Sequence, residues 1–499
     1  MNASPWIATS PGGPEHPELD GDVRADVAVI GGGITGVTTA LVLAEAGARV
    51  VLLEADRLAH GVTGYTTAKV SSQHGLIYDR LRSRFGADTA RAYGTANEAA
   101  LSWIAERVAR DGIECDLRRR PSFVYGDDRS QLESEAEAAA DAGLPASFTS
   151  QVPLPLRAAG AVRFEDQAEF HVGRYMAGLA SVLDAAGCDI FERTRAVEVD
   201  ADEHCVIKTP GGTVTADRVV VAAHYPFLDR SLAFARVHTE RSYAILCRIE
   251  GAAPEGMFIS AGSPTRSVRA VPLDGEELLL VGGEGHRTGT GGDTRERYER
   301  LEAFAREHWN VRAVEYRWSA QDAMTVDGLP YVGRLTPSED RVLMATGFAK
   351  WGMTGGTAAA SVLADLVQGR ENPARSLFDP YRLTIRASAQ GLVEDALQFG
   401  LHFVGDRLRK PDRGSLDDLG PGEGGIVRHG GEKVAAYRDA DGAVVAVSPV
   451  CSHLGCQVNF NTAERSWDCP CHGSRFAPDG TVLEGPATHR LELKPAGDG

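Results

Sequence analysis

Two short boxes of cysteine and histidine near the end of the chain constrain its fold more than any other feature. The boxes are Cys451-Ser-His453-Leu-Gly-Cys456 and Cys469-Pro-Cys471-His472-Gly-Ser474. Each box offers one thiolate and one imidazole, as Cys-x-His in the first and as Cys-x-x-His in the second. Thiolate and imidazole together suit either zinc or an iron–sulfur centre. The last part of the chain is therefore expected to fold around a metal centre.

Two thiolates on one iron and two neutral imidazoles on the other describe a [2Fe–2S] centre of the Rieske type, and the boxes closely resemble the Rieske family. The resemblance implies the ligands Cys451, His453, Cys469 and His472. It also implies a disulfide bond between Cys456 and Cys471 that joins the two cluster loops. A structural zinc site is the alternative, but it would give this second cysteine pair no role.

A dinucleotide fingerprint lies near the N-terminus in the strand–turn–helix context that it requires. An apolar strand over residues 26–30 leads into Gly31, Gly33 and Gly36, and an Ala/Leu/Val-rich helix follows. The glycines permit a tight turn, close approach of a pyrophosphate and packing of the helix on the strand. Glu54 ends the second strand, where it can accept hydrogen bonds from ribose hydroxyls. We expect the pyrophosphate to lie at the N-terminus of this helix.

The choice between FAD and NAD follows from the iron–sulfur acceptor. Gly282-Gly283-Glu-Gly285 also follows an apolar run, but no helical pattern succeeds it, so we expect a turn at a sheet end there. A chain with one dinucleotide site and a one-electron acceptor needs a cofactor that takes two electrons and releases them singly. Flavin does this and nicotinamide does not, so the expected cofactor is FAD.

A third segment agrees with a flavoprotein. A strand over residues 341–347 is followed by Trp351-Gly-Met-Thr354-Gly-Gly, which opens an Ala-rich helix. Such a helix N-terminus can stabilise negative charge on a reduced flavin. With Asp327-Gly-Leu-Pro-Tyr-Val-Gly333, this segment resembles the D-amino-acid-oxidase-like family, which includes glycine and sarcosine oxidases. The resemblance covers about residues 24–385.

The resemblance implies an α/β, Rossmann-like FAD-binding domain, an antiparallel-sheet substrate domain, and flavin contacts beyond the fingerprint. The implied contacts are Thr63, Thr67, Lys69, Val197, Gly347, Gly352 and Thr354. Lys69 would offset the charge of the pyrophosphate, and the backbone of Val197 would reach the adenine. Covalent attachment of the flavin to Tyr65 or His74 stays open, whereas residues 327–356 contain no cysteine for a thiol link.

The candidates for the space above the flavin ring are Tyr243, Lys350 and Trp351. Arg241 or Arg269 could clamp a substrate carboxylate. Each of these residues also has a purely structural interpretation, as sheet packing, a surface cation or an ion-paired core group. No serine, histidine and acid arrangement of a hydrolase stands out, so catalysis is expected to rest on hydride transfer from substrate to flavin.

Composition excludes several partners. The chain has 499 residues and a net charge of −17, which argues against binding nucleic acid or anionic membranes and would suit a basic redox partner. No apolar run approaches the length needed to cross a bilayer, and the N-terminus does not read as a secretion signal, so we expect a cytoplasmic protein. The cysteines outside the boxes are expected to be reduced core thiols: Cys115, Cys188, Cys205 and Cys247.

We expect four parts along the chain. They are a loose surface leader (1–24), an FAD-dependent oxidoreductase unit with interleaved FAD-binding and substrate subdomains (25–385), a helical linker (386–414) and a C-terminal all-β Rieske domain (415–499). Helical patterns cover residues 78–112, 129–142, 174–186 and 294–310, and residues 236–290 alternate as strands do.

Three functions remain compatible with the sequence. The first is a dehydrogenase in which an amine or amino-acid-like substrate reduces FAD and electrons pass singly through the cluster to an acceptor, which can be a protein. The second is an electron-transfer protein in which FAD only relays electrons from a partner. The third is an oxidase with a structural Rieske domain. A ring-hydroxylating oxygenase is excluded, because none of the fourteen histidines forms the His-x₄-His pair of its mononuclear iron site.

Overall fold

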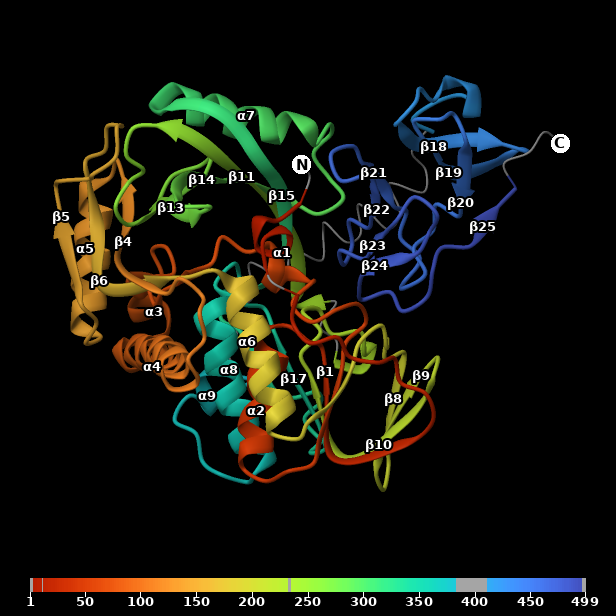
Figure 1. The fold of residues 1–499 in the computed structure, drawn as a ribbon, viewed down its shortest axis with the longest axis horizontal. Helices are drawn as coiled ribbons and strands as arrows, with labels where there is room; N and C mark the ends of the chain where they lie inside the picture. The colour runs from red at the N-terminus through yellow and green to blue at the C-terminus, as the bar shows by residue number, and fades with distance from the viewer. Residues whose placement is uncertain (1–2, 11, 232–234, 383–410, 496–499) are drawn as a thin grey trace.

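The computed structural model describes residues 3–10, 12–231, 235–382 and 411–495. Three layers are visible in Figure 1, with a nucleotide-binding layer below, a large sheet above it and the C-terminal domain beside both. In the described residues no helix is both long enough and apolar enough to span a bilayer.

The nucleotide-binding layer is a mixed sheet with a parallel centre. Its main path is β16 (Tyr331–Arg334), β17 (Val342–Thr346), β10 (Gly212–Val221), β1 (Val23–Ile30), β2 (Val50–Leu53) and β7 (Asp189–Phe191), and the hairpin of β8 (Glu198–Ala201) and β9 (Cys205–Thr209) joins β10. The residues of β2 and β17 are buried throughout, as expected for strands covered on both faces. On one face pack α2 (Ile34–Glu45), α6 (Val172–Ala185) and α8 (Gly352–Val367).

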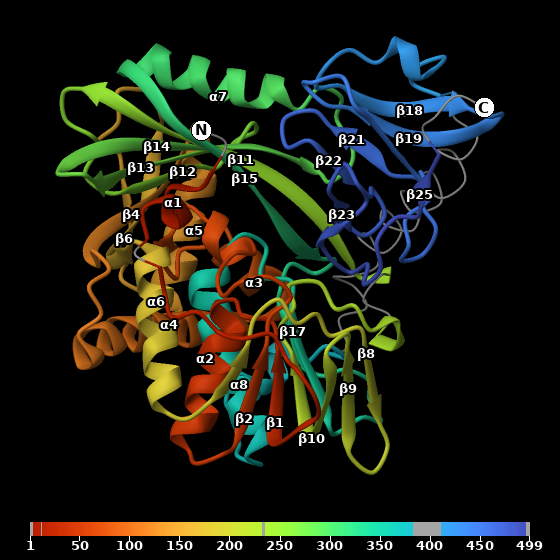
Figure 2. The same cartoon turned by 45° about the vertical axis from the view of Figure 1, so that its right-hand side comes forward.

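The second layer is the substrate-domain sheet. Its path is β15 (Asn310–Thr325), β11 (Val237–Glu250), β14 (Glu276–Arg287), β13 (Arg266–Leu273), β12 (Met257–Ser260), β4 (Arg118–Gly126), β6 (Gly160–Glu169) and β3 (Lys69–Val70), with β5 (Ala146–Thr149) on β6. All its pairings are antiparallel except β12 with β4. The long strands β11 and β15 reach from this layer to the C-terminal domain (Figure 2).

The remaining helices follow the predicted patterns. They are α3 (Tyr78–Phe85), α4 (Ala87–Asp111), α5 (Arg129–Asp141), α7 (Arg295–His308), the short α1 (Pro5–Ala8) and α9 (Arg375–Phe378), and the 3₁₀ turns η1 (Val62–Tyr65), η2 (Asp229–Ser231) and η5 (Leu416–Asp418). The predicted helix over 78–112 is divided at Gly86, whose φ of 94° no ordinary helical residue adopts. The four predicted helical segments are otherwise confirmed.

The C-terminal domain is built from two four-stranded antiparallel sheets. One contains β18 (Gly424–His429), β19 (Glu432–Arg438), β20 (Val444–Val447) and β25 (Leu493–Lys494), and the other β21 (Asn459–Asn461), β22 (Ser466–Asp468), β23 (Arg475–Phe476) and β24 (Val482–Glu484). The predicted all-β fold is confirmed. Most of the predicted linker lies outside the described residues.

Two sequence-based expectations are wrong. Gly282–Gly285 lies inside β14 rather than in a turn, because the strand continues through a bulge opposite Arg241–Tyr243. The leader is not loose, since the Trp6 side chain is only 1% exposed and its Nε1 donates to the Thr66 carbonyl. Burial of the large apolar Trp6 ring stabilises this placement, so the leader packs on the protein surface instead of hanging free.

Candidate active site and cluster site

The fingerprint glycines form a cradle that no larger residue could make. A Cβ on Gly36 would lie 1.8 Å from the carbonyl oxygen of Gly31, and a Cβ on Gly31 would lie 2.5 Å from that of Ala222. Gly31 also has a φ of 112°. At the helix N-terminus, the Ile34 amide donates to the Thr63 hydroxyl. These contacts fit the approach of a pyrophosphate to α2.

Glu54 directly follows β2 and contacts the fingerprint turn. Its carboxylate accepts hydrogen bonds from the amides of Gly32 and Asp56, at 2.6 and 2.9 Å. Burial raises the pKa of Glu54. The carboxylate lines the cavity beside the fingerprint, where a ribose would lie.

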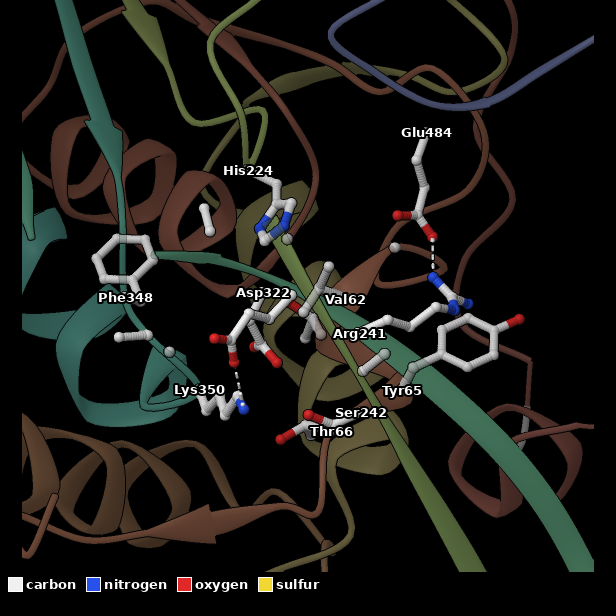
Figure 3. A pocket seen from close by; sticks show the side chains of 18 of the residues that line it. Val62, Tyr65, Thr66, His224, Arg241, Ser242, Asp322, Phe348, Lys350 and Glu484 are labelled. Atoms are coloured by element: carbon white, nitrogen blue, oxygen red, sulfur yellow. Dashed lines mark hydrogen bonds and ion pairs between the residues drawn. The ribbon is translucent and has the colours of Figure 1, made fainter. Parts of the chain in front are cut away.

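A cavity of about 1090 Å³ extends from this cradle to the C-terminal domain. Its walls are the fingerprint turn, the η1 segment, parts of β11 and β15, the N-terminus of α8, and residues 483–488 of the C-terminal domain. Figure 3 shows labelled side chains of η1, β11, β15, the segment before α8 and the C-terminal domain around this space. The volume and elongated lining suit a dinucleotide with room for a small substrate.

The predicted flavin contacts divide into two groups. Thr63, Thr67, Lys69 and Gly352 line the cavity. Val197, Gly347 and Thr354 are absent from its lining. Thr354 instead donates to the Ser71 carbonyl, and a Cβ on Gly347 would lie 2.2 Å from Thr325, so both shape the entry to α8 rather than the cavity wall.

Val197 is misassigned as an adenine contact. Its amide donates to the Lys208 carbonyl, which begins the β8–β9 hairpin. The cavity is lined instead by the preceding Thr194, Arg195 and Ala196. The sequence pattern indicated a strand in this region, but it did not indicate the residue at which the β8–β9 hairpin begins.

Lys69 lies on the substrate side rather than at the pyrophosphate. Its ammonium contacts the Ser267 hydroxyl on β13. Burial, together with the nearby positive charge of Arg269, lowers the pKa of Lys69 to about 7. Lys69 is therefore suited to exchanging protons near neutral pH rather than to offsetting phosphate charge.

The two residues considered for covalent flavin attachment differ in position. His74 does not line the cavity, and its ring nitrogens contact Tyr93, Ser71 and Thr354. Burial lowers the pKa of His74 to about 3. Tyr65 does line the cavity (Figure 3). The geometry thus disfavours attachment at His74.

The three candidates for the space above the ring have different surroundings. Lys350 lines the cavity and its ammonium lies 2.9 Å from the Glu240 carboxylate. Trp351 lines it too and stacks on the His74 ring at 4.7 Å between centroids. Tyr243 also lines the cavity, and its hydroxyl lies 3.1 Å from Nε2 of His286 on β14. All three candidates therefore border the same space.

The two predicted carboxylate clamps are engaged by acids of the protein itself. Arg269, 1% exposed, lies 3.1 Å from Glu169 and donates to the Thr67 carbonyl. Arg241 is 2% exposed and lies 3.5 Å from Glu464 and 3.9 Å from Glu484, both of the C-terminal domain. Figure 3 shows Arg241 directed toward Glu484. Arg269 is absent from the cavity lining, whereas Arg241 lines the cavity and its Nε and Nη1 have no hydrogen-bond partner.

Sequence reasoning missed two acids in the cavity wall. Glu240 on β11 pairs across the strands with Asp322 on β15, and both line the cavity near Lys350. Hydrogen bonding and the Lys350 charge lower the pKa of Glu240 to about 2, whereas burial raises that of Asp322 to about 6. The pairing of the two strands creates this site, and no local motif signals it.

The cluster boxes converge in the C-terminal domain. Cys456 and Cys471 form a disulfide bond, as predicted. The buried thiols of Cys451 and Cys469 hydrogen-bond to each other, and the rings of the two box histidines lie 5.1 Å apart. Nδ1 of His453 is buried without a hydrogen-bond partner. Two thiols, two imidazoles and an inward-facing nitrogen fit a Rieske cluster.

Comparison with known proteins decides the family. Residues 26–366 match the family model "DAO: FAD dependent oxidoreductase", and residues 413–495 match "Rieske [2Fe-2S] domain". The chain belongs to the DAO family of FAD-dependent oxidoreductases. This DAO-family chain carries a Rieske domain at its C-terminus, and its cofactors are FAD and a [2Fe–2S] cluster.

Two curated relatives differ in the share of this chain that they match. The chain is 37% identical over 484 residues to the "Putative Rieske 2Fe-2S iron-sulfur protein YhfW" of Bacillus subtilis, covering 96% of this chain and 95% of that protein. It is 27% identical to the gamma-glutamylputrescine oxidoreductase of Escherichia coli, covering 70% and 85%.

Solved structures share the fold of the DAO-family unit. L-proline dehydrogenase from P. horikoshii has a TM-score of 0.61 at 17% identity, covering 73% of this chain and 98% of that chain. Glycine oxidase from Geobacillus kaustophilus has a TM-score of 0.57 at 20% identity, covering 72% and 99%. The expected fold class is confirmed.

The Gly36→Ala variant tests the cradle of this DAO-family chain. The added Cβ would meet the Gly31 carbonyl, so the turn must open and FAD should be lost during purification. We expect the flavin absorbance per chain to fall by about 90% or more, since an overpacked site of this kind costs about 1–3 kcal/mol. Gly262→Ala is the control, because Gly262 has no positive φ and a Cβ there meets no atom within 4 Å. Full FAD content in Gly36→Ala would contradict the cradle.

Proposed function

We propose that the protein is an FAD-dependent dehydrogenase that oxidises an amine or amino-acid-like substrate and passes the electrons singly through its Rieske cluster to an acceptor. The observation that carries this proposal is the shared cavity, whose lining includes the fingerprint at one end and residues 483–488 of the Rieske domain at the other. The family consists of oxidoreductases that act on amino or amine substrates.

The residues of the chain support distinct steps. Bound FAD would supply a two-electron acceptor that can release electrons one at a time. Asp322 and Lys69 line the cavity and have pKa values of about 6 and 7, so either can take the proton of a substrate ammonium near neutral pH. Trp351 would orient the substrate together with Lys350, whose ammonium pairs with the Glu240 carboxylate. Asp322 is our candidate for the proton acceptor.

The division of the chain belongs to the same proposal. We assign residues 25–385 to the oxidoreductase unit, 386–414 to the linker and 415–499 to the Rieske domain. A cytoplasmic location and a one-electron acceptor protein are also part of it. The net charge of −17 supports a basic acceptor.

Anaerobic mixing with amines tests the substrate half of the proposal. The holoprotein would be mixed with glycine, L-proline or γ-glutamylputrescine, which are suggested by the names of similar proteins. We expect at least one to bleach the flavin absorbance without any partner protein. Bleaching only after a reduced partner protein is added would support the relay function instead.

The pH dependence of bleaching tests the role of Asp322. Burial raises its pKa, so the carboxylate form that accepts a proton predominates above about pH 6. The bleaching rate should rise as the pH increases through about 6. Asp322→Asn should lose this rise and slow bleaching by about 10²-fold or more. An unchanged profile would remove Asp322 from the mechanism.

A further inference from the structure

The segment between β10 and η2 touches both the flavin cavity and the cluster site. β10 ends at Val221, and the amide of Ala222 then donates to the Ile30 carbonyl beside the fingerprint. Ala222, Ala223 and His224 line the cavity. The same segment continues to Asp229 in η2.

The far end of this segment contacts both histidines of the cluster boxes. The Tyr225 ring lies 6.3 Å from the His472 ring, between centroids. The Asp229 carboxylate lies 2.7 Å from Nε2 of His453. Because a carboxylate only accepts, Nε2 of His453 must carry the proton and donate it. Eight residues of the flavin domain therefore span the distance from the cavity to both imidazoles.

The contact to Asp229 fixes which nitrogen of His453 faces the cluster. With Nε2 donating to the carboxylate, Nδ1 is the remaining nitrogen, and it is buried without a hydrogen-bond partner. Histidine ligands of metals commonly donate their other ring N–H to a carboxylate, which sets the ring orientation and makes the ligand more basic. Asp229 is thus placed to orient a cluster ligand from the other domain.

The two domains meet closely enough to hold this arrangement. The Gln321 amide donates to the Gly473 carbonyl, at 2.8 Å. A Cβ on Gly473 would lie 2.3 Å from the Thr239 hydroxyl, and a Cβ on Gly289 would lie 2.7 Å from the Pro470 nitrogen. Backbone approach of this kind leaves no room for the second cluster loop to shift on the sheet.

We propose that residues 222–229 are the electron-transfer bridge between the flavin cavity and the cluster. Asp229 is the positioning residue that orients His453 at the cluster end of this bridge. This inference rests on the proposed direction of electron flow. Each transfer moves one electron from reduced flavin to the cluster, where one ferric iron becomes ferrous. Two transfers therefore follow each hydride, and a one-electron acceptor reoxidises the cluster after each.

The test uses the holoprotein and needs no amine substrate. The flavin is photoreduced with 5-deazariboflavin by a laser flash, and reduction of the cluster is followed by its absorbance, normalised to bound iron. The cluster potential is measured separately by dithionite titration with EPR detection. Because added EDTA supplies the electrons through photoexcited 5-deazariboflavin, failure of the amine screen would leave this test intact.

We expect Asp229→Ala to slow flavin-to-cluster transfer by about 10- to 100-fold, the usual cost of removing a carboxylate that orients a metal ligand. The carboxylate stabilises the oxidised cluster, which carries more positive charge than the reduced one. Its removal should therefore raise the cluster potential. Asp229→Asn keeps an oxygen acceptor for Nε2–H and should retain most of the rate.

Asp217→Ala is the matched control. Asp217 makes a comparable contact to a histidine, 3.1 Å from Nδ1 of His204, but both side chains are more than half exposed and neither belongs to the cluster boxes. The control should match the wild type in rate and potential. Equal rates and potentials in Asp229→Ala and Asp217→Ala would overturn the proposal.

Discussion

Replacing Cys469 by serine is expected to remove the iron–sulfur cluster and leave FAD bound. The thiol of Cys469 is buried beside that of Cys451, and a serine hydroxyl cannot replace a thiolate on iron. The wild type should contain about two irons and two acid-labile sulfides per chain, together with about one FAD. In Cys469→Ser, iron and sulfide should fall close to zero while flavin absorbance stays unchanged.

The FAD content stays unchanged because the flavin cradle belongs to the other domain. The fingerprint glycines and Glu54 make their contacts within the nucleotide-binding layer. Iron, sulfide and flavin can be assayed on the same purified sample. Zinc in place of iron in the wild type would contradict the Rieske assignment.

Cys456→Ser is the matched control for this experiment. Cys456 is buried like Cys469 but is bonded to Cys471, so its sulfur is not free to bind iron. The variant should keep its iron after purification, and the cluster should be lost faster on warming because the two loops are no longer joined. Iron loss as complete as in Cys469→Ser would mean that the ligand assignment is wrong.

The sequence was sufficient where function depends on neighbouring residues. Gly31, Gly33 and Gly36 act within one turn, and the cluster boxes act within six residues each. Their physical requirements, close backbone approach and paired soft ligands, leave a local pattern. The fold class and both cofactors follow from these patterns and are confirmed.

Contacts between distant segments could not be predicted in the same way. Glu240 and Asp322 meet only through the register of β11 on β15, and Asp229 meets His453 across 224 positions of sequence. Tyr243 lines the cavity, and its hydroxyl lies 3.1 Å from His286, a contact that alternation along a single strand does not reveal. Tertiary pairing decides such sites.

The misjudged leader and the misjudged arginine clamp have one cause. The guanidinium of Arg269 lies 5.2 Å from the Trp6 ring centroid, and its Nη1 lies 3.1 Å from Glu169. A leader residue, a substrate-sheet cation and a buried acid thus form one internal cluster. Each looked separate in the sequence, because more than 90 positions lie between neighbours in this cluster.

Removing the charge of Glu169 should therefore destabilise the protein strongly. Glu169 is 2% exposed and lies 3.1 Å from Arg269 and 2.5 Å from Arg118. Glu169→Gln keeps the size of the side chain but leaves the fully buried Arg269 guanidinium without its counter-charge. Breaking one partner of a buried pair costs about 3–5 kcal/mol, so the free energy of unfolding should fall by that amount. Urea unfolding followed by circular dichroism measures it.

Glu277→Gln is the control that distinguishes the loss of the buried Glu169–Arg269 pair from the loss of an exposed ion pair. Glu277 also pairs with Arg118, but its side chain is 44% exposed, so water replaces the lost interaction and the expected cost is below about 1 kcal/mol. Because Arg269 donates to the Thr67 carbonyl in the cavity wall, Glu169→Gln should also release FAD more readily than the control. If the two variants were equally stable, Arg269 would not be a structural cation, and its predicted role as a clamp for a substrate carboxylate would return.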